Sequence, residues 1–316
     1  MQLQTNIPIK KQSCNLINYN AKLLLLGSCF STNIGNKLAY YKFRTIENPF
    51  GILFHVKAIE KLIVNALNKK VYTQEDIFFH NERWNCFDAH SSLSATDKNQ
   101  LLSTLNNALE LTNKQVTNAS HLVITLGTSW VYKEVASDNT VANCHKLPQK
   151  HFTKEILSVD EILKSLKNMI TLVKSVNKDI TVLFTVSPVR HLKDGFIANQ
   201  QSKAHLITAI HQVVNQKEVC YFPAYEIMMD ELRNYRFYTQ DMLHPNSTAI
   251  DYIWDKFLIA WVADETNQTM QEIASLQKGL AHRPFNPNTE QHMLFVKKLE
   301  QQKTELQKKF PFMKFE

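Results

Sequence analysis

Residues 22–31 read Lys22-Leu23-Leu24-Leu25-Leu26-Gly27-Ser28-Cys29-Phe30-Ser31. A short, uninterrupted apolar run is typical of a strand that is buried on both faces of a parallel sheet. Gly27 ends the run, and residues 31–40 have the pattern of a helix. The stretch therefore predicts a buried strand that turns directly into a helix.

The same alternation continues along the chain. Further strands are expected at 41–46, 121–126, 179–186 and 218–222, and further helices at 56–67, 101–111, 159–176, 202–215 and 248–262. This order predicts an α/β fold with a doubly wound, mainly parallel five-stranded sheet flanked by helices. In such sheets ligands bind beyond the carboxyl ends of the strands, so the residues that follow each strand are the places to seek chemistry.

Two stretches depart from this pattern. Residues 130–151 are expected to be an irregular insertion near the active edge of the sheet. From residue 264 onward Gln, Lys and Glu dominate and apolar positions are sparse. We therefore expect a catalytic domain at 1–263 and a helical C-terminal extension at 264–316.

Composition narrows the function classes. The chain has 316 residues, of which 44% are apolar, so it can bury one substantial core. The net charge is +7, but the basic residues are scattered among acidic ones, which argues against a nucleic-acid partner. Apolar runs fall far short of the ~20 residues of a membrane span.

The expected location rests on two observations. No apolar stretch follows Lys10 and Lys11, as a secretory signal requires. The five cysteines are odd in number and include no Cys-x-x-Cys pair, which fits a reducing compartment. The expected location is cytoplasmic.

Cofactor motifs are also missing from the sequence. Only six glycines occur, and neither Gly-x-Gly-x-x-Gly nor a phosphate-binding loop can be formed from them. The histidines show no metal-ligand spacing with cysteines or carboxylates. We expect neither a cofactor nor a metal.

Two candidate nucleophiles, Ser28 and Cys29, stand at the junction between the first strand and its helix. Unpaired backbone N–H groups and the helix dipole at such a place favour a thiolate or an oxyanion. A purely structural reading is also open, in which Ser28 caps the helix and Cys29 is a small buried residue.

A second candidate pair lies just before the last core helix, in Asp241-Met242-Leu243-His244-Pro245. An aspartate three residues before a histidine can bind one ring nitrogen and leave the other to act as a base. The structural alternative is a capped turn with a surface histidine.

The order of these features resembles the SGNH or GDSL hydrolase superfamily, and more closely its GSCFA branch, named for a Gly-Ser-Cys-Phe-Ala motif. The resemblance covers about residues 22–254 and implies an SGNH/flavodoxin-like three-layer sandwich. It rests on Gly27 to Ser31 and on five further segments that occur in order: Asn48-Pro49-Phe50-Gly51, Gly127-Thr128-Ser129-Trp130-Val131-Tyr132, Asn143-Cys144-His145-Lys146, Ser187-Pro188-Val189-Arg190-His191 and Tyr235-Arg236-Phe237-Tyr238.

The resemblance implies a role for each matching residue. Cys29 falls at the superfamily's nucleophilic serine, with Ser28 as the alternative nucleophile, and Asp241 and His244 fall at the acid and base. Gly51 matches the glycine whose N–H enters the oxyanion hole. Ser129 stands where the superfamily has an oxyanion-binding Asn, a departure that weakens the hole unless another donor such as Asn143 replaces it.

Further substrate-binding candidates are Trp130, Asn143, His145, Arg190 and His191. Trp130 offers a platform for a sugar ring or simply covers the core. Arg190 and His191 follow the fourth strand and can bind an anionic group or act as structural residues, and His145 has an exposed polar loop as its alternative.

The leading hypothesis is an esterase or acyltransferase acting on a small-molecule or glycan acyl ester. One alternative is a noncatalytic module on the same fold that binds a carbohydrate or an acylated ligand. Another is a scaffold whose C-terminal extension mediates self-association. Nothing in the sequence predicts the acyl group, the acceptor or an oligomeric state.

Overall fold

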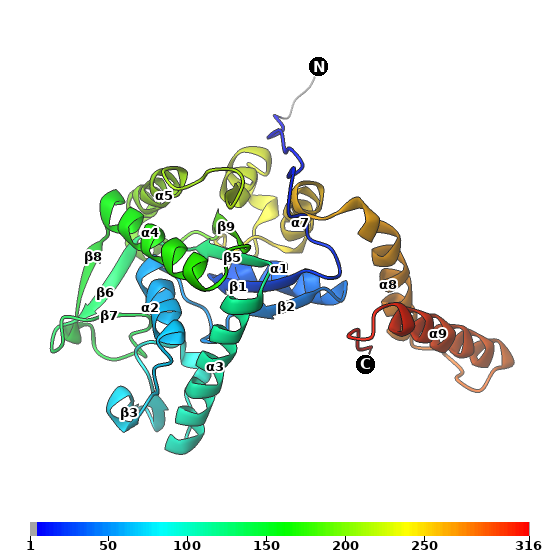
Figure 1. Cartoon of the computed structure of the whole chain (residues 1–316), viewed down its shortest axis with the longest axis horizontal. Helices are drawn as coiled ribbons and strands as arrows, with labels where there is room; N and C mark the ends of the chain where they lie inside the picture. Colours follow the sequence, from blue (N-terminus) through cyan, green and yellow to red (C-terminus); the bar gives the residue numbers. More distant parts are fainter. Residues whose placement is uncertain (1–4, 316) are drawn as a thin grey trace.

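The computed structural model describes residues 5–315 and has a parallel five-stranded sheet at its centre (Figure 1). The strand order is β10-β9-β5-β1-β2, and every neighbouring pair is parallel. This order places the switch point of a doubly wound sheet between β1 and β5. The predicted α/β fold class is confirmed. The strands are β1 (Lys22–Gly27), β2 (Arg44–Glu47), β5 (His121–Leu126), β9 (Thr181–Val186) and β10 (Val219–Phe222).

Helices cover both faces of the sheet. One face carries α2 (Val56–Leu67), α3 (Lys98–Asn118), α4 (Val159–Val176) and α5 (Phe196–His211). The other carries α1 (Cys29–Tyr40), the short α6 (Ala224–Glu226) with its π-helical continuation Ile227–Glu231, and α7 (Ser247–Trp261). Within residues 5–315, no helix has the length and apolarity needed to cross a membrane.

The leucine run of β1 explains why the sheet lies in the middle. Leu24 and Leu26 pack into the core on the α2 side, whereas Leu23 and Leu25 pack into the core on the α1 side, and all four are fully buried. Alternate residues of a strand point to opposite faces, so a continuous apolar run suits a strand covered on both sides. Each buried leucine contributes about 1.5–3 kcal/mol.

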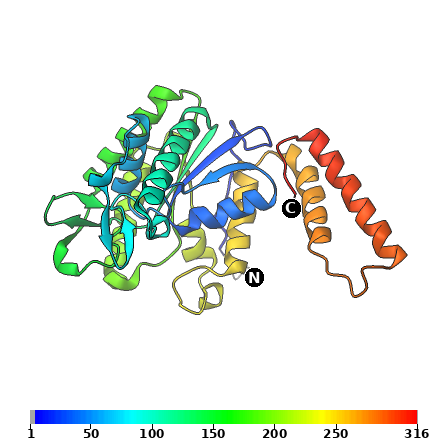
Figure 2. The same ribbon diagram turned by 90° about the horizontal axis from the view of Figure 1, so that it is seen from below.

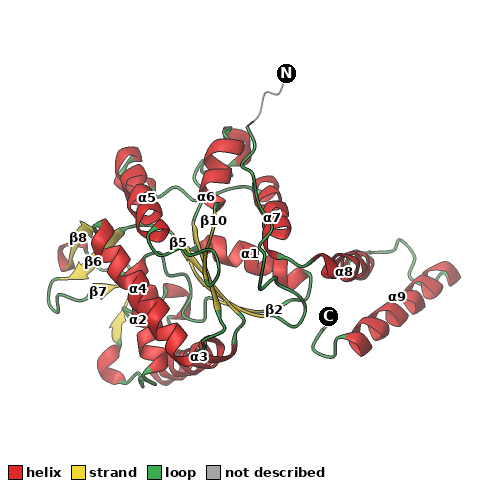
Figure 3. Ribbon diagram, turned by 45° about the horizontal axis from the view of Figure 1, so that its top comes forward, coloured by secondary structure: helices red, strands yellow, loops and turns green. Residues whose placement is uncertain are grey.

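The expectation of an irregular insertion at 130–151 is wrong. This region starts a small antiparallel sheet of β6 (Trp130–Glu134), β7 (Thr140–Val141) and β8 (Phe152–Ile156), in the order β7-β6-β8 (Figure 3). Only Val131 and Val141 of β6 and β7 are buried, so the apolar alternation is too short to be recognised in the sequence. A second small hairpin, β3 (Phe78–His80) with β4 (Arg83–Asn85), lies between α2 and α3.

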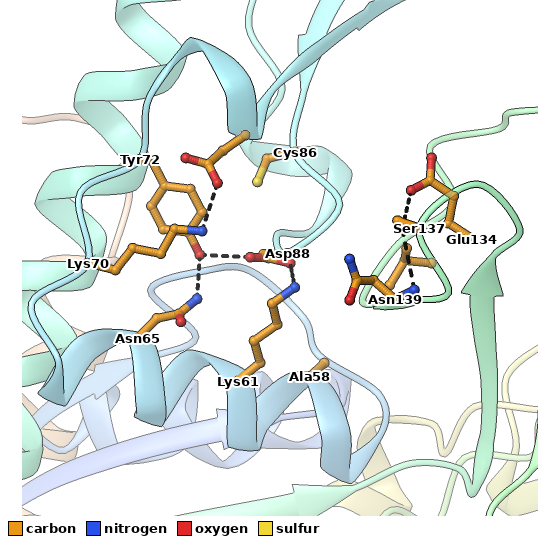
Figure 4. Close-up of polar contacts among 12 residues, drawn as sticks. Ala58, Lys61, Asn65, Lys70, Tyr72, Cys86, Asp88, Glu134, Ser137 and Asn139 are labelled. Atoms are coloured by element: carbon orange, nitrogen blue, oxygen red, sulfur yellow. Dashed lines mark hydrogen bonds and ion pairs between the residues drawn. The ribbon is translucent and has the colours of Figure 1, made fainter.

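A polar network ties the segment between α2 and α3 to α2 itself (Figure 4). Asp88 forms an ion pair with Lys61 at 2.6 Å and accepts a hydrogen bond from the Tyr72 hydroxyl, which also accepts one from Asn65. The adjacent Phe87 carbonyl accepts from the N–H of Ala142. The network therefore helps to fix the loop that follows β7, and this loop lines the candidate site described below.

The C-terminal part forms two helices, α8 (Asn267–Leu280) and α9 (Glu290–Lys309), which stand together to one side of the sandwich (Figure 2). The chain after α9 returns to the sheet, where Phe310 packs on Tyr19 and Phe312 lies against the guanidinium of Arg44 in β2. The extension is thus held on the α1 side of the fold by aromatic contacts.

Gly27 is the residue that permits the junction between β1 and α1. Its φ is +125°, and a Cβ atom there would lie 2.1 Å from the carbonyl oxygen of Thr125. Gly27→Ala is therefore expected to combine backbone strain of about 1–3 kcal/mol with overpacking of a similar size, ~1–3 kcal/mol. Gly195 also has a positive φ, +88°, but open space around it. In urea denaturation Gly195→Ala should show the strain alone, and an equal loss of stability in both variants would contradict this account.

Candidate active site

The turn after β1 separates the two candidate nucleophiles. Ser28 is fully buried, and its hydroxyl donates to the Ser187 hydroxyl at 2.9 Å. Its N–H and its carbonyl bind Thr125 and Ser31 of the surrounding backbone. Cys29, the first residue of α1, is half-buried and lines a cavity of about 450 Å³ beyond the strand ends.

His244 and Asp241 form a hydrogen-bonded pair in the loop before α7. The distance from His244 Nδ1 to Asp241 Oδ2 is 2.6 Å, so Nδ1 carries a proton and Nε2 is left to accept one. The other carboxylate oxygen accepts from the Thr239 hydroxyl and from the N–H groups of Leu243 and His244. These bonds, led by the one from Thr239, hold the pKa of Asp241 well below its usual range.

The cavity brings together residues that are far apart in the sequence. Cys29 follows β1, Thr128 follows β5, Arg190 and His191 follow β9, and His244 precedes α7. The Arg190 N–H donates to the Leu243 carbonyl at 3.2 Å, which fastens the His244 loop to the β9 loop. The site lies at the carboxyl edge of the sheet, near its switch point, as expected for this topology.

Opposing effects act on the Cys29 thiol. Burial raises its pKa, whereas the Ser28 hydroxyl, the charge of Lys203 and the N–H groups of Cys29 and Phe30 lower it, and the net direction is upward. The resting group is therefore a neutral thiol. A base must remove its proton during any attack on a carbonyl carbon.

Both sequence-predicted oxyanion residues have their donors engaged elsewhere. The Gly51 N–H donates to the Asn48 carbonyl at 2.7 Å. Ser129 is fully buried, its hydroxyl donates to the Ser202 carbonyl at 2.7 Å, and its N–H donates to the Ser202 hydroxyl. Neither Gly51 nor Ser129 lines the cavity that Cys29 faces.

The substrate-binding candidates from residues 130–151 divide into two groups. Trp130 and Asn143 line the cavity, and the Asn143 side-chain oxygen accepts from the His145 N–H at 2.8 Å. His145 is buried away from the cavity, with its Nε2 on the Cys86 carbonyl and its ring against Phe78.

Arg190 and His191 both reach the cavity but differ in charge. The Arg190 guanidinium lies over the Tyr238 ring at 4.4 Å. Burial lowers the pKa of His191 to about 3, aided by the positive charges of Lys203 and His244, so its ring is neutral at neutral pH. Its Nε2 is buried and finds no hydrogen-bond partner within the described part of the chain.

Sequence reasoning missed Lys203, a fully buried lysine on α5. Its Nζ donates to the carbonyls of Gly127 and Ser187, both at 2.7 Å. Burial lowers the pKa of Lys203 to about 7, and the Cys29 sulfur acts in the opposite direction. One sequence signal was present, because Lys203 stands on the same helical stripe as Leu206 and Ile210, where an apolar residue is expected.

Thiol, imidazole, carboxylate and amide groups face the cavity. Between residues 5 and 315, the structure brings no three His, Cys, Asp or Glu side chains together as a metal site.

Three solved structures are similar to this chain. One, a carbohydrate esterase family 3 protein from Talaromyces cellulolyticus, is 9% identical, with a TM-score of 0.36 over 81% of this chain and 99% of that one. Another, a mutant acetyl esterase with acetate ion, is 9% identical, with a TM-score of 0.37 over 80% and 99%. An acetyl xylan esterase from the rumen bacterium Butyrivibrio proteoclasticus is 11% identical, with a TM-score of 0.38 over 81% and 66%. No curated protein matches the sequence.

Family models match most of the chain. The model of the GSCFA family matches residues 22–257, which include the sheet, the Cys29 turn and the His244 loop. A second model, described as the C-terminal domain of GSCFA domain proteins, matches residues 273–316. The first match covers well over half of the sequence, and on this ground the chain belongs to the GSCFA family.

Proposed function

We propose that this protein is an SGNH-type acyl-ester hydrolase or acyltransferase that uses Cys29 as nucleophile and His244 as base. The observation that carries the proposal is that Cys29 and His244 line one cavity while Asp241 binds the far nitrogen of His244. Acyl transfer requires a nucleophile, a base and an orienting acid, and these three side chains supply one group of each kind.

The reaction begins with a neutral thiol. As the Cys29 sulfur bonds to the ester carbonyl carbon, its proton passes to His244 Nε2 and the carbonyl electrons move onto oxygen. Collapse of this intermediate expels the alcohol, which takes the proton back from His244, and leaves a thioester on Cys29. Water or a sugar hydroxyl then attacks the thioester carbonyl while His244 takes its proton. The C–S bond breaks, the free acid or the acylated sugar leaves, and His244 returns the proton to the Cys29 sulfur. Asp241 stays ionised throughout because its hydrogen bonds hold its pKa low.

The oxyanion needs donors other than Gly51 and Ser129, which are engaged elsewhere. The Cys29 N–H at the start of α1 is one, because the first N–H groups of a helix lack intrahelical acceptors. Asn143 is the other, since its carboxamide oxygen is used by His145 and its NH₂ group remains as a donor. One such donor contributes about 2.7–4 kcal/mol to acyl transfer.

The substrate class we propose is an acylated carbohydrate. Trp130 and Tyr132 line the cavity with aromatic surface, which suits the apolar face of a sugar ring, and Asn143 and Arg190 add polar groups at its wall. The test is turnover of acetylated sugars and of an activated acetyl ester by the full chain, with product masses to separate hydrolysis from transfer to a sugar. No turnover of any ester by folded protein would contradict the proposal.

A second candidate is a noncatalytic module that binds a carbohydrate or an acylated ligand in the same cavity. The observation that favours it is the engagement of both sequence-predicted oxyanion donors. Calorimetry and turnover assays with acetylated sugars separate the two functions. A noncatalytic module binds the ligand and turns none of it over, with or without Cys29.

A further inference from the structure

A buried lysine lies beneath the turn that carries Cys29. The Lys203 amine reaches the sheet from α5 and donates to the carbonyls of Gly127 and Ser187, both at 2.7 Å. These residues directly follow β5 and β9 at the carboxyl edge. A single amine thus joins the ends of two neighbouring strands below the cavity.

A chain of hydrogen bonds continues from Lys203 to the nucleophile's turn. The carbonyl of Ser187 accepts from Lys203, and the Oγ of Ser187 accepts a hydrogen bond from the Ser28 hydroxyl at 2.9 Å. Ser28 immediately precedes Cys29, and its carbonyl accepts from the Ser31 N–H in the first turn of α1. The position of the Cys29 backbone therefore depends in part on Lys203.

The charge of Lys203 also acts on Cys29. The fully buried amine donates to two carbonyls, and within the described residues no carboxylate pairs with it. Burial without an opposite charge is costly for a cation. The positive charge lowers the pKa of the Cys29 thiol, and a negative charge on that sulfur raises the pKa of Lys203 in turn. Each group therefore favours the ionised form of the other.

We propose that Lys203 is a positioning residue for the nucleophile, which fixes the strand ends beneath the Cys29 turn and stabilises negative charge on the Cys29 sulfur. The inference rests on the proposed function only in taking Cys29 as the nucleophile. In the reaction, protonated Lys203 acts as the thiol proton leaves for His244, because negative charge then develops on a sulfur whose ionised form the lysine's charge favours.

Other ionisable groups face the same cavity and contribute to the thiol's surroundings. They are the weak acids Tyr132, on β6, and Cys144, after β7, together with His55, before α2, the residues Arg190, His191, Lys193 and Asp194 after β9, and His244, before α7. Asp194 is paired with Lys154. His55 and His191 are neutral because burial lowers the pKa of His55 to about 4 and that of His191 to about 3. The Tyr225 ring, 5.6 Å from Lys203, faces the amine from its other side.

The first experiment measures the rate of Cys29 alkylation by iodoacetamide against pH, with peptide mapping to separate Cys29 from the other four cysteines. The variants are Lys203→Met and Lys203→Arg. The control is Lys37→Met, which removes a partly exposed cation from the last turn of α1, the helix that begins at Cys29. Lys203→Met should alkylate about tenfold more slowly at pH 6, where Lys203 carries its charge in wild type, and the difference should shrink at higher pH as Lys203 loses its proton. Lys203→Arg, which keeps a cation, should lie closer to wild type. Lys37→Met should match wild type because Lys37 is partly exposed and paired with Asp251.

An unchanged alkylation rate at pH 6 in Lys203→Met, in protein with the circular dichroism of wild type, would overturn the proposal. This readout reports thiol ionisation and needs no ester turnover. Slower alkylation of Lys203→Met at pH 6 in a protein that hydrolyses no ester would contradict the proposed function alone, whereas ester hydrolysis with unchanged alkylation rates would contradict the role of Lys203 alone.

A second measurement needs no change at Lys203, in case that variant does not fold. In ¹⁵N-lysine spectra of wild type and Cys29→Ser, the Nζ signal of Lys203 is followed against pH. Coupling between two sites is reciprocal, so loss of the thiol should lower the pH at which Lys203 titrates. Identical titrations in the two proteins would contradict the electrostatic link.

Discussion

Replacing Cys29 by alanine is expected to lower the ester turnover of this protein by about 10³-fold or more, because removing a nucleophile abolishes the covalent route and leaves only binding and oxyanion contacts. The side chain is small and half-buried, so the fold should survive the change. The measurement is kcat and KM for an activated acetyl ester. Loss of kcat with KM nearly unchanged is the expected pattern.

Ser28→Ala is the matched comparison for this prediction. Ser28 is fully buried with its hydroxyl on Ser187, and it does not line the cavity that Cys29 faces. Its loss should cost stability by roughly 0.5–1.5 kcal/mol, because the Ser187 hydroxyl then keeps only the hydrogen bond from the Val189 N–H, and it should leave most of the turnover in folded protein. Full turnover in Cys29→Ala together with none in Ser28→Ala would show that the serine is the nucleophile.

His244→Ala is expected to lower kcat by about 10²–10⁴-fold, the usual contribution of a positioned base. The thiol is neutral at rest because burial raises the pKa of Cys29, so it depends on His244 for deprotonation. His151→Ala removes an exposed histidine outside the cavity and serves as the control. Equal kcat values for the two histidine variants would contradict the assignment of His244.

The Asp241 carboxylate sets one expectation for the pH profile of the wild-type protein. The pKa of Asp241 is held below its usual range, so the carboxylate remains ionised through neutral and mildly acidic pH. Loss of activity on mild acidification therefore does not report protonation of Asp241. Combining His244→Ala with Asp241→Asn should cost little more than His244→Ala alone, because the two residues act as a unit.

The elements with long apolar patterns were predictable from the sequence. The helices at 56–67 and 159–176 and the strand at 121–126 have the expected bounds. Shorter or more polar elements were not. The strand expected at 41–46 begins at Arg44, because the chain turns at Lys42 with a positive φ, and the helix expected at 202–215 runs from Phe196 to His211.

The candidate site was predictable only in part, for a physical reason. Cys29, Asp241 and His244 could be named because each stands in a local motif. The engagement of Ser129 by Ser202 could not be foreseen, because it depends on how α5 packs against the end of β5. The same packing places Lys203 under the Cys29 turn, so its contacts follow from tertiary structure and not from spacing.

The most direct test of the account is peptide mapping by mass spectrometry after brief exposure to an activated acetyl ester, in wild type, Cys29→Ala, Ser28→Ala and His244→Ala. We predict the mass gain of one acetyl group on the peptide that carries Cys29, removable by neutral hydroxylamine as a thioester is, absent in Cys29→Ala and slow to form in His244→Ala. Ser28→Ala should still be acetylated. An acetyl group on Ser28, or none on either residue in a protein that turns over the ester, would contradict the central claim.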